Sequence, residues 1–223
     1  KCRNTLDFWS WEGLGVYLLK KSDETFRSAK KWPVHWRNTE TRYQKEKVWK
    51  MADIIKTYRQ SVPAMRFIGK KYSDANRVNG GFAQQWVEWF SNGWFHMLQS
   101  GFDLATLDED GDATIGLMRW KEGEPFEYWI GVFCPPETHV PDGFSHIDFP
   151  ASDLGVAWVY GKEGDVFGQE ERCAERCMMD GFEIVTDEQG AYWFFERYVC
   201  PRFTTPDEQG SIILDICHYI AKK

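Results

Sequence analysis

The predicted strands and helices occur in the same order twice along the chain, and this repeat limits the possible folds more than any other feature of the sequence. In the first half, residues 62–72 form a short apolar run beside a proline, which is typical of a strand. Four aromatic side chains then recur at i, i+4, i+7 and i+8, the spacing of one helical face: Phe82, Trp86, Trp89 and Phe90. Residues 113–120 and 126–133 follow as two strands separated by a turn that contains a glycine, which predicts a β-hairpin. The segment that leads to the second half ends in a short predicted strand, residues 144–149.

The second half repeats this order with similar element lengths. Residues 154–161 are predicted to form a strand, residues 165–179 a helix with Asp165 as its N-cap, and residues 191–200 and 211–220 two further strands. Because the halves share this order but little sequence, we infer an internal duplication with a pseudo-two-fold axis rather than a solenoid, whose units are much shorter. The expected fold is therefore α+β, with two pseudo-symmetric strand-helix-strand-strand units whose antiparallel sheets form a central ligand groove.

Charge divides the chain into an N-terminal extension, residues 1–50, and a domain, residues 51–223. Residues 20–50 contain ten basic and four acidic side chains, a net charge of +6, whereas residues 51–223 contain fifteen and twenty-eight, a net charge of −13. An acidic body of this size repels phosphate backbones, so nucleic-acid binding by residues 51–223 is not expected. We interpret the basic, Trp-rich extension as a helical segment that docks on the acidic domain, while contact with nucleic acid stays open as the alternative.

Several other classes of site and location are disfavoured. No stretch approaches the roughly 18 consecutive apolar residues of a membrane span, and the N-terminus lacks the apolar core of a signal peptide, so we expect a cytoplasmic chain without a membrane partner. Aspartates alternate in residues 108–112, but Ala113 and Arg119 occupy the positions where an EF-hand needs Gly and Glu. Cys173 and Cys177 lie one helical turn apart without a second ligand pair to complete a zinc site. The sequence therefore predicts neither a metal nor a cofactor, and it leaves a homodimer open.

The predicted strand at residues 191–200 carries one acid among aromatic residues. Alternation places Tyr192, Phe194, Glu196 and Tyr198 on one face and the residues between them on the other. One interpretation is that Glu196 is solvated or paired with a nearby Arg or Lys. The other is an aromatic box with an acid at its base, which would attract flat, cationic, lipophilic molecules. The high aromatic content of the chain, 17% with 12 tryptophans, supports the second interpretation.

A set of short motifs resembles the signature of GyrI-like domains, the small-molecule effector-binding domains of AraC-type and related multidrug-responsive regulators. The signature positions are Tyr128-Trp129-Ile130-Gly131-Val132-Phe133, Pro135, Val140-Pro141, Gly143-Phe144, Ile147 and Pro150-Ala151. Matching positions elsewhere are Phe67-Ile68-Gly69, Trp86, Trp89, Phe195-Glu196-Arg197-Tyr198, Ile212, Leu214 and Ile216. The resemblance covers about residues 51–223. It departs from the family at Cys217-His218-Tyr219-Ile220, where members often carry Ile-Pro-Ile, and at the N-terminus, which does not resemble the regulators' DNA-binding domain.

The resemblance implies a drug or metabolite sensor or sequestering protein whose ligand is a small hydrophobic or cationic molecule. The family's acidic residue matches Glu196, and candidate wall residues of the pocket are Trp86, Trp89, Tyr128, Trp158, Tyr160, Trp193 and Tyr198. Some family members use the matching glutamate to hydrolyse electrophilic hydrophobic genotoxins. The alternative function is therefore a hydrolase, with Glu196 as the base and Tyr128 as a proton donor. A weaker alternative is a ligand-responsive transcriptional regulator.

Overall fold

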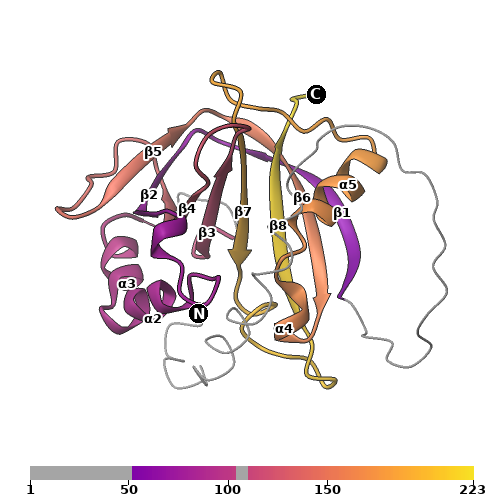
Figure 1. Cartoon of the computed structure of the whole chain (residues 1–223), viewed down its shortest axis with the longest axis horizontal. Coiled ribbons are helices and arrows are strands. Elements are labelled where there is room, and N and C mark those ends of the chain that lie inside the picture. Colours follow the sequence, from indigo (N-terminus) through magenta and orange to yellow (C-terminus); the bar gives the residue numbers. More distant parts are fainter. Residues whose placement is uncertain (1–51, 104–109) are drawn as a thin grey trace.

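The computed structural model describes residues 52–103 and 110–223, which form one eight-stranded antiparallel sheet with short helices against one face (Figure 1). The predicted N-terminal extension, residues 1–50, lies outside the described residues. In the part of the chain that is described, none of the helices has the length and apolar character needed to cross a membrane.

The first unit contains the strands and the helix expected from the sequence, together with a second short helix that the sequence analysis did not predict. Its elements are β2 (Met65–Tyr72), a 3-10 turn (Asp74–Asn76), α2 (Ala83–Ser91), α3 (Trp94–Gln99), β3 (Thr114–Trp120) and β4 (Glu127–Cys134). The break between α2 and α3 falls at Gly93, whose φ of +65° is a left-handed conformation that favours glycine. The turn reorients α3, so that both helices pack their aromatic residues onto β4.

The second unit follows the same plan. Its elements are β6 (Ser152–Gly161), α4 (Glu163–Val166), α5 (Glu170–Met179), β7 (Tyr192–Tyr198) and β8 (Ile212–Ile220). The predicted helix over residues 165–179 is divided into α4 and α5, and Gln169 is the N-cap of α5. The prediction that Asp165 caps this helix is wrong, because Asp165 lies inside α4 and Lys162 is the N-cap residue there.

Two further strands cover the edges of the sheet and extend the pseudo-symmetry. β1 (Asp53–Val62), which the sequence analysis did not predict, pairs with β6 of the second unit, and β5 (Ser145–Phe149) pairs with β2 of the first. Each unit therefore begins with a strand that is added to the edge of the other unit. Because β1 pairs with the second unit and β5 with the first, the two units are joined at both edges of the sheet.

The strand order β1-β6-β8-β7-β3-β4-β2-β5 makes the duplication visible. The inner strands read β6-β8-β7 in one unit and β2-β4-β3 in the other, and the units meet where β7 pairs with β3. This arrangement confirms the predicted α+β fold of two strand-helix-strand-strand units. It also shows that the antiparallel sheets of the two units are joined into a single sheet.

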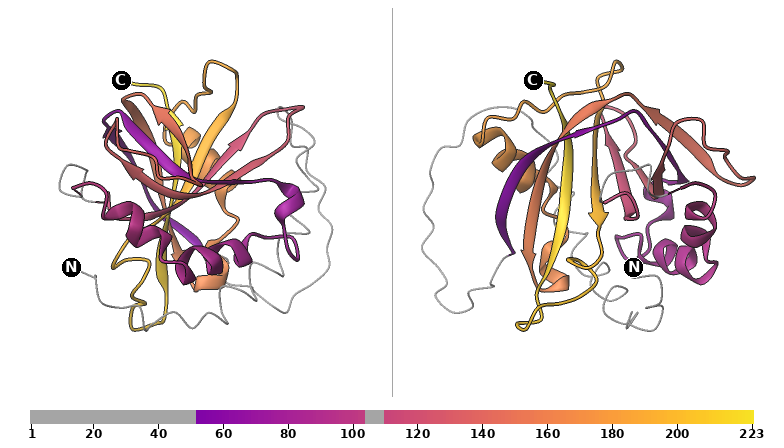
Figure 2. Two further views of the ribbon diagram at one scale, coloured as in Figure 1. Left: turned by 90° about the vertical axis from the view of Figure 1, so that its left-hand side faces the viewer. Right: turned by 180° about the vertical axis from the view of Figure 1, so that it is seen from behind.

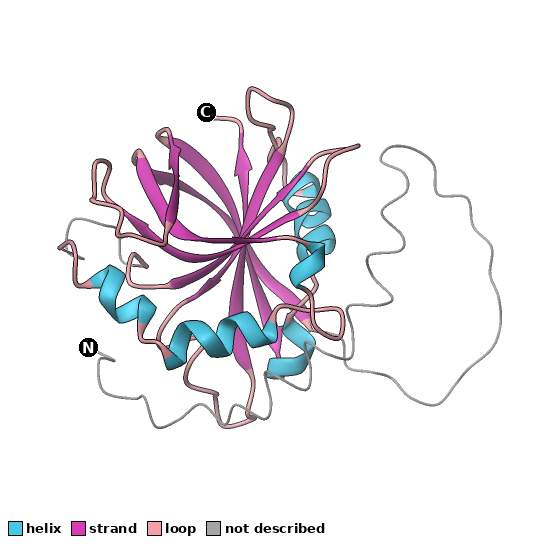
Figure 3. Ribbon diagram, turned by 60° about the vertical axis from the view of Figure 1, so that its left-hand side comes forward, coloured by secondary structure: helices cyan, strands magenta, loops and turns pink. Residues whose placement is uncertain are grey.

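The two faces of the sheet bury different cores. On the helix face, α2 and α3 cover an aromatic cluster over β4, while α4 and α5 cover a mainly aliphatic cluster over β6 and β8 (Figure 2). The opposite face of the sheet also buries a core. Its strands are strongly twisted relative to one another, so that side chains from distant strands meet on this face (Figure 3). This twist brings Phe149 of the edge strand β5 onto Tyr219 of β8, with ring centroids 5.1 Å apart. On the helix face, the α2–α3 pair and the α4–α5 pair lie on either side of the central strands.

The cysteines considered as metal ligands lie in the core. Cys173 and Cys177 lie on the buried face of α5, and burial raises the pKa of the Cys177 thiol to about 11. Within residues 52–103 and 110–223, no group of three or more His, Cys, Asp or Glu side chains could hold a metal ion. Part of the acidic loop at residues 108–112 lies outside the described residues.

Candidate functional site

The candidate site lies on the helix face at the centre of the sheet, where β7 and β3 run between the two helix pairs (Figure 1). Phe194 and Tyr198 of β7 both pack against the aromatic cluster under α2 and α3. Glu196 lies between them on the same face, and only 6% of its surface is exposed. The predicted acid on an aromatic strand face is therefore a buried one.

Glu196 is held among tyrosine and tryptophan side chains from three elements. The Tyr198 hydroxyl donates a hydrogen bond of 2.7 Å to Oε2 of Glu196. The indole Nε1 of Trp86, on α2, donates a hydrogen bond of 3.0 Å to the Tyr128 hydroxyl, and its ring meets Tyr198 edge-on at 4.8 Å. Gly116 of β3, opposite Glu196, makes room for these groups: a Cβ there would lie 2.7 Å from the Tyr128 oxygen and 3.3 Å from Oε2 of Glu196.

The electrostatic environment of Glu196 contains no compensating cation from the described residues. The groups that act on its ionisation are Tyr198 and a second carboxyl, Glu170. Burial raises the pKa of Glu196 to about 8, and the nearby charge of Glu170 contributes in the same direction. The hydrogen bond from Tyr198 opposes this shift, because it favours the carboxylate. At neutral pH Glu196 is therefore a carboxyl group close to its own titration point.

Glu170 belongs to the site, although the sequence analysis did not find it. It is the first residue of α5 and is partly buried, and its negative charge contributes to the raised pKa of Glu196. The backbone carbonyl of Glu170 accepts a hydrogen bond of 3.2 Å from Nε2 of His218, on β8. Because α5 begins 26 positions before Glu196 in the sequence, no local pattern could have predicted that these carboxyl groups meet.

His218 extends the aromatic surroundings along the sheet. Its ring stacks on Phe194 with centroids 5.4 Å apart, and burial lowers its pKa to about 4. It is thus a neutral aromatic group at neutral pH. This residue is one of those at which the sequence departs from the GyrI-like pattern, and its identity bears directly on the site.

The two tyrosines of the site are hydrogen-bond donors rather than anions. Burial raises the pKa of Tyr128 and of Tyr198 well above the ordinary value of 10, and the negative charge of Glu196 adds to both shifts. Each hydroxyl therefore keeps its proton across the physiological range and can transfer or share it only within a hydrogen bond.

Four predicted wall residues are not brought to Glu196. Trp89 is fully buried in the aromatic core, where its Nε1 donates to the Tyr72 hydroxyl at 2.9 Å. Trp158 and Trp193 pack with the core on the opposite face of the sheet. Tyr160 has the same alternation as Trp158 on β6, and its hydroxyl donates to Asp207 at 2.7 Å. Of the residues predicted to line the site, the structure gathers Glu196, Trp86, Tyr128 and Tyr198.

Arg197, the residue next to Glu196, does not neutralise it. Its side chain points to the opposite face of the sheet and contacts Asp215 at 2.9 Å and Asp110 at 3.1 Å. Arg202 contacts the same two aspartates at 2.6 and 2.8 Å. The four side chains form a charge-balanced cluster on that face, so Arg197 is not a partner of Glu196.

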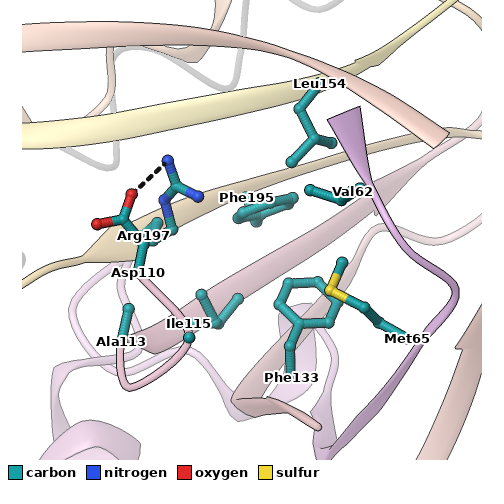
Figure 4. A pocket seen from close by; sticks show the side chains of 10 residues that line it. Val62, Met65, Asp110, Ala113, Ile115, Phe133, Leu154, Phe195 and Arg197 are labelled. Carbon is teal, nitrogen blue, oxygen red and sulfur yellow. Dashed lines mark ion pairs between the residues drawn. The ribbon is translucent and has the colours of Figure 1, made fainter. Parts of the chain in front are cut away.

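A small cavity lies beside this cluster on the opposite face (Figure 4). Figure 4 shows apolar side chains such as Phe133 and Phe195 around it, with the Arg197 and Asp110 ion pair at one side. Its volume of about 30 Å³ has room for only one or two water molecules. Sites for drug-sized ligands are about 300–1,000 Å³, so this cavity is a packing feature of the core.

Two solved structures are similar to this fold. One is a protein from Staphylococcus aureus MU50 that is provisionally assigned to bacterial transcription regulation; it is 16% identical, with a TM-score of 0.52, over 75% of this chain and 99% of that chain. The other is SAV2435 bound to tetraphenylphosphonium, 16% identical, with a TM-score of 0.53, over 75% of this chain and 94% of that chain. No protein-family model and no curated protein matches the sequence. At these identities the likeness shows the fold, which covers three quarters of this chain (75%) and nearly the whole length of each of the two similar proteins.

Proposed function

We propose that residues 51–223 form a GyrI-like effector-binding domain that binds small lipophilic cations between its two helix pairs, for sensing or sequestration. The observation that carries this proposal is Glu196, a buried carboxyl group among aromatic side chains for which the described residues supply no cation. Burying a carboxylate without a partner is costly, so such a group either keeps a proton or awaits a positive charge from outside the protein.

The surroundings of Glu196 suit a flat or spherical aromatic cation. Tyr198 is hydrogen-bonded to Glu196, and Trp86 contacts the Tyr198 ring edge-on and donates a hydrogen bond to Tyr128, so three aromatic rings lie around the carboxyl group. A cation over such rings gains about 0.5–2 kcal/mol, and a charge-assisted contact with a carboxylate is about twice as strong as a neutral hydrogen bond. The similar fold of SAV2435, bound to tetraphenylphosphonium, supports the same class of ligand.

Binding of matched charged and neutral probes tests the proposal. Tetraphenylphosphonium carries a permanent charge, and triphenylphosphine oxide presents similar rings without one. We expect Glu196→Gln to weaken tetraphenylphosphonium by about 30-fold, which corresponds to ~2 kcal/mol, because the attraction to the carboxylate is removed. The neutral probe should change by less than about threefold, since glutamine keeps the shape of the side chain.

Glu122→Gln provides the control, because Glu122 lies in the exposed turn between β3 and β4. It makes the same chemical change on the surface and should leave both probes unaffected. Equal losses for the charged and neutral probes in Glu196→Gln would remove Glu196 from the binding site. Absence of tetraphenylphosphonium binding to the unaltered protein at any pH would overturn the proposal itself.

A hydrolase is the second candidate, and one specific observation favours it. The Tyr128 hydroxyl and Glu196 Oε2 both face the space above Gly116, so a proton donor and a carboxyl group that titrates near pH 8 lie side by side. In this reading Glu196 positions or deprotonates a water molecule and Tyr128 protonates the leaving oxygen. Turnover of electrophilic hydrophobic substrates, lost in Glu196→Gln and in Tyr128→Phe, would establish the enzyme, whereas stoichiometric binding without turnover supports the binding protein.

A further inference from the structure

We propose that the end of β3 and the start of β7 form a second part of the binding site, which takes the flat aromatic end of an elongated ligand whose cationic end lies at Glu196. The residues of this part, called the aromatic strip below, are Trp120, Tyr192, Phe194 and His218. The inference rests on the proposed function and names the class of ligand. The sequence analysis assigned none of these residues to the wall of the pocket.

Strand register places the aromatic strip in a row that ends at Glu196. Tyr192, Phe194 and Glu196 alternate along β7 and lie on the helix face. Trp120 of β3 pairs directly with Tyr192, and His218 of β8 pairs directly with Phe194. From the rise of a strand, Phe194 lies about 7 Å and Tyr192 about 14 Å from Glu196. The strip is therefore continuous with the buried acid and extends from it in one direction.

Ring contacts join the side chains of neighbouring strands within the strip. The rings of Trp120 and Tyr192 stack with their centroids 6.0 Å apart and an interplanar angle of 29°. The rings of Phe194 and His218 stack with their centroids 5.4 Å apart and an angle of 20°. Trp120 and Phe194 also pack against the aromatic cluster under α2 and α3. A ligand ring would thus meet rings that already support one another.

The outer end of the strip is accessible to solvent. Tyr192 is 37% exposed, and it is the only aromatic residue among the exposed large hydrophobic side chains of residues 52–103 and 110–223. The helices α2 and α3 pack on β4, whereas α4 and α5 pack on β6 and β8. None of these described helices crosses the end of β3 or the start of β7 (Figure 1). The strip therefore runs from an exposed ring to the buried carboxyl group of Glu196.

A hydrogen-bonded turn holds the backbone on both sides of Tyr192. Oδ1 of Asp187 accepts hydrogen bonds of 2.9 Å from the backbone amides of Gln189 and Ala191. Its Oδ2 accepts one of 2.8 Å from Nε1 of Trp193, and its own backbone amide donates to the carbonyl of Ala191 at 2.8 Å. Because this backbone is already fixed, ordering the strip for a ligand costs little conformational entropy.

The row of groups suits a ligand with a positive charge at one end and a flat ring at the other. The carboxyl group of Glu196 attracts the charge. Aromatic rings attract another ring in offset-stacked or edge-to-face arrangements, beyond the effect of the apolar area that is buried. A compact cation occupies only the end of the row near Glu196, whereas an elongated aromatic cation spans it. The site should therefore prefer elongated aromatic cations over compact ones and over elongated saturated ones.

Calorimetric titration with two trimethylammonium probes tests the length of the site. In (8-phenyloctyl)trimethylammonium the ring reaches Tyr192 when the charge lies at Glu196, whereas in (2-phenylethyl)trimethylammonium it does not. We expect Tyr192→Leu to weaken the long probe by about five- to tenfold, which corresponds to ~1–1.4 kcal/mol, and the short probe by less than about twofold. Tyr192→Phe keeps the ring and should bind both probes as the unaltered protein does.

A saturated probe and a control variant separate aromatic recognition from general apolar contact. (8-Cyclohexyloctyl)trimethylammonium has similar apolar bulk but no aromatic ring, so Tyr192→Leu should change its affinity by less than about twofold. Equal losses for the phenyl and cyclohexyl probes would overturn the proposed ligand class. Met97→Ala is the control, because Met97 is an exposed apolar side chain of α3, and it should leave every probe unaffected. Equal Tm values for the variants and the unaltered protein verify that they are folded.

The outcomes separate this inference from the proposed function. If Glu196→Gln weakens both phenyl probes while Tyr192→Leu weakens neither, the proposed function stands and the inference is overturned. If neither these probes nor tetraphenylphosphonium binds the unaltered protein, the proposed function itself fails. Sedimentation without ligand examines the other possible occupant of the strip: a dimer that is lost in Tyr192→Leu would show a contact between two copies of the chain and would also overturn the inference.

Discussion

Glu196 should make the free protein less stable at alkaline pH, and Glu196→Gln should remove this penalty. The pKa of the carboxyl is raised to about 8 from an ordinary value of 4.5, so the folded state retains a proton that the unfolded chain releases. The stabilisation from this proton is complete below pH 4.5 and is lost as the pH rises toward 8. Each pH unit in that interval is worth about 1.4 kcal/mol, and relaxation around the carboxylate reduces the total, so we expect Glu196→Gln to be more stable than the unaltered protein by about 2–4 kcal/mol at pH 8.5.

Urea unfolding without ligand at pH 5, 7 and 8.5 measures this difference directly. The two proteins should have similar free energies of unfolding at pH 5 and should diverge as the pH rises, whereas Glu122→Gln should follow the unaltered protein throughout. The lowered pKa of His218 acts in both proteins alike, since it reduces stability only as the pH falls from about 6.5 toward 4. A Glu196→Gln variant that is less stable than the unaltered protein at pH 8.5 would show that the carboxylate has a stabilising partner, and would refute the reasoning for an uncompensated acid.

Two further substitutions test the close packing at the site and the ion cluster on the opposite face of the sheet. Gly116→Ala should destabilise the protein by about 1–3 kcal/mol and weaken tetraphenylphosphonium binding, because the new Cβ would lie 2.7 Å from the Tyr128 hydroxyl oxygen; thermal unfolding and titration check this, and a variant with unchanged Tm and affinity would contradict it. Arg202→Met should cost about 3–5 kcal/mol in urea unfolding, because it leaves the buried Asp110 and Asp215 with one guanidinium between them. The exposed pair of Arg176 with Asp180 is the control, and Arg176→Met should cost less than about 1 kcal/mol.

The strands and helices that pack through a regular apolar face were predictable from the sequence, and the exceptions have physical causes. β1 was missed because it is an edge strand whose side chains are mostly exposed or half-buried, so it lacks the apolar alternation of a core strand. Its partner β6 lies far along the chain, and only the folded sheet reveals the pairing. The predicted helix over residues 165–179 is divided because Gly168 adopts a left-handed backbone conformation, and the unpredicted helix α3 begins after a similar break at Gly93. Periodicity registers neither of these breaks.

Residues of the candidate site were predictable only where strand alternation determines which face of the sheet a side chain occupies. Alternation correctly grouped Glu196 with Tyr198, and the same rule places Trp193 on the opposite face. For Trp158 the face depends on how β6 joins β8, which a single strand does not reveal. Glu170 could not be anticipated, since its carboxyl reaches the site from the beginning of a helix that the sequence predicted to start five residues earlier.

The pseudo-two-fold axis explains why the site contains a single strand-borne acid at the centre of a duplicated frame. β3 and β7 each have seven residues and pair with Leu117 opposite Phe195 at their midpoint, so the axis passes there. It relates Glu196 to Met118 of the first unit, which is packed in the aromatic cluster under α2 and α3. The symmetric frame thus supplies two equivalent positions, and one is filled by a thioether that completes a core. The other carries a carboxyl group because the opposite position, Gly116, leaves space there for a tyrosine hydroxyl and for the charge that the proposed ligand would neutralise.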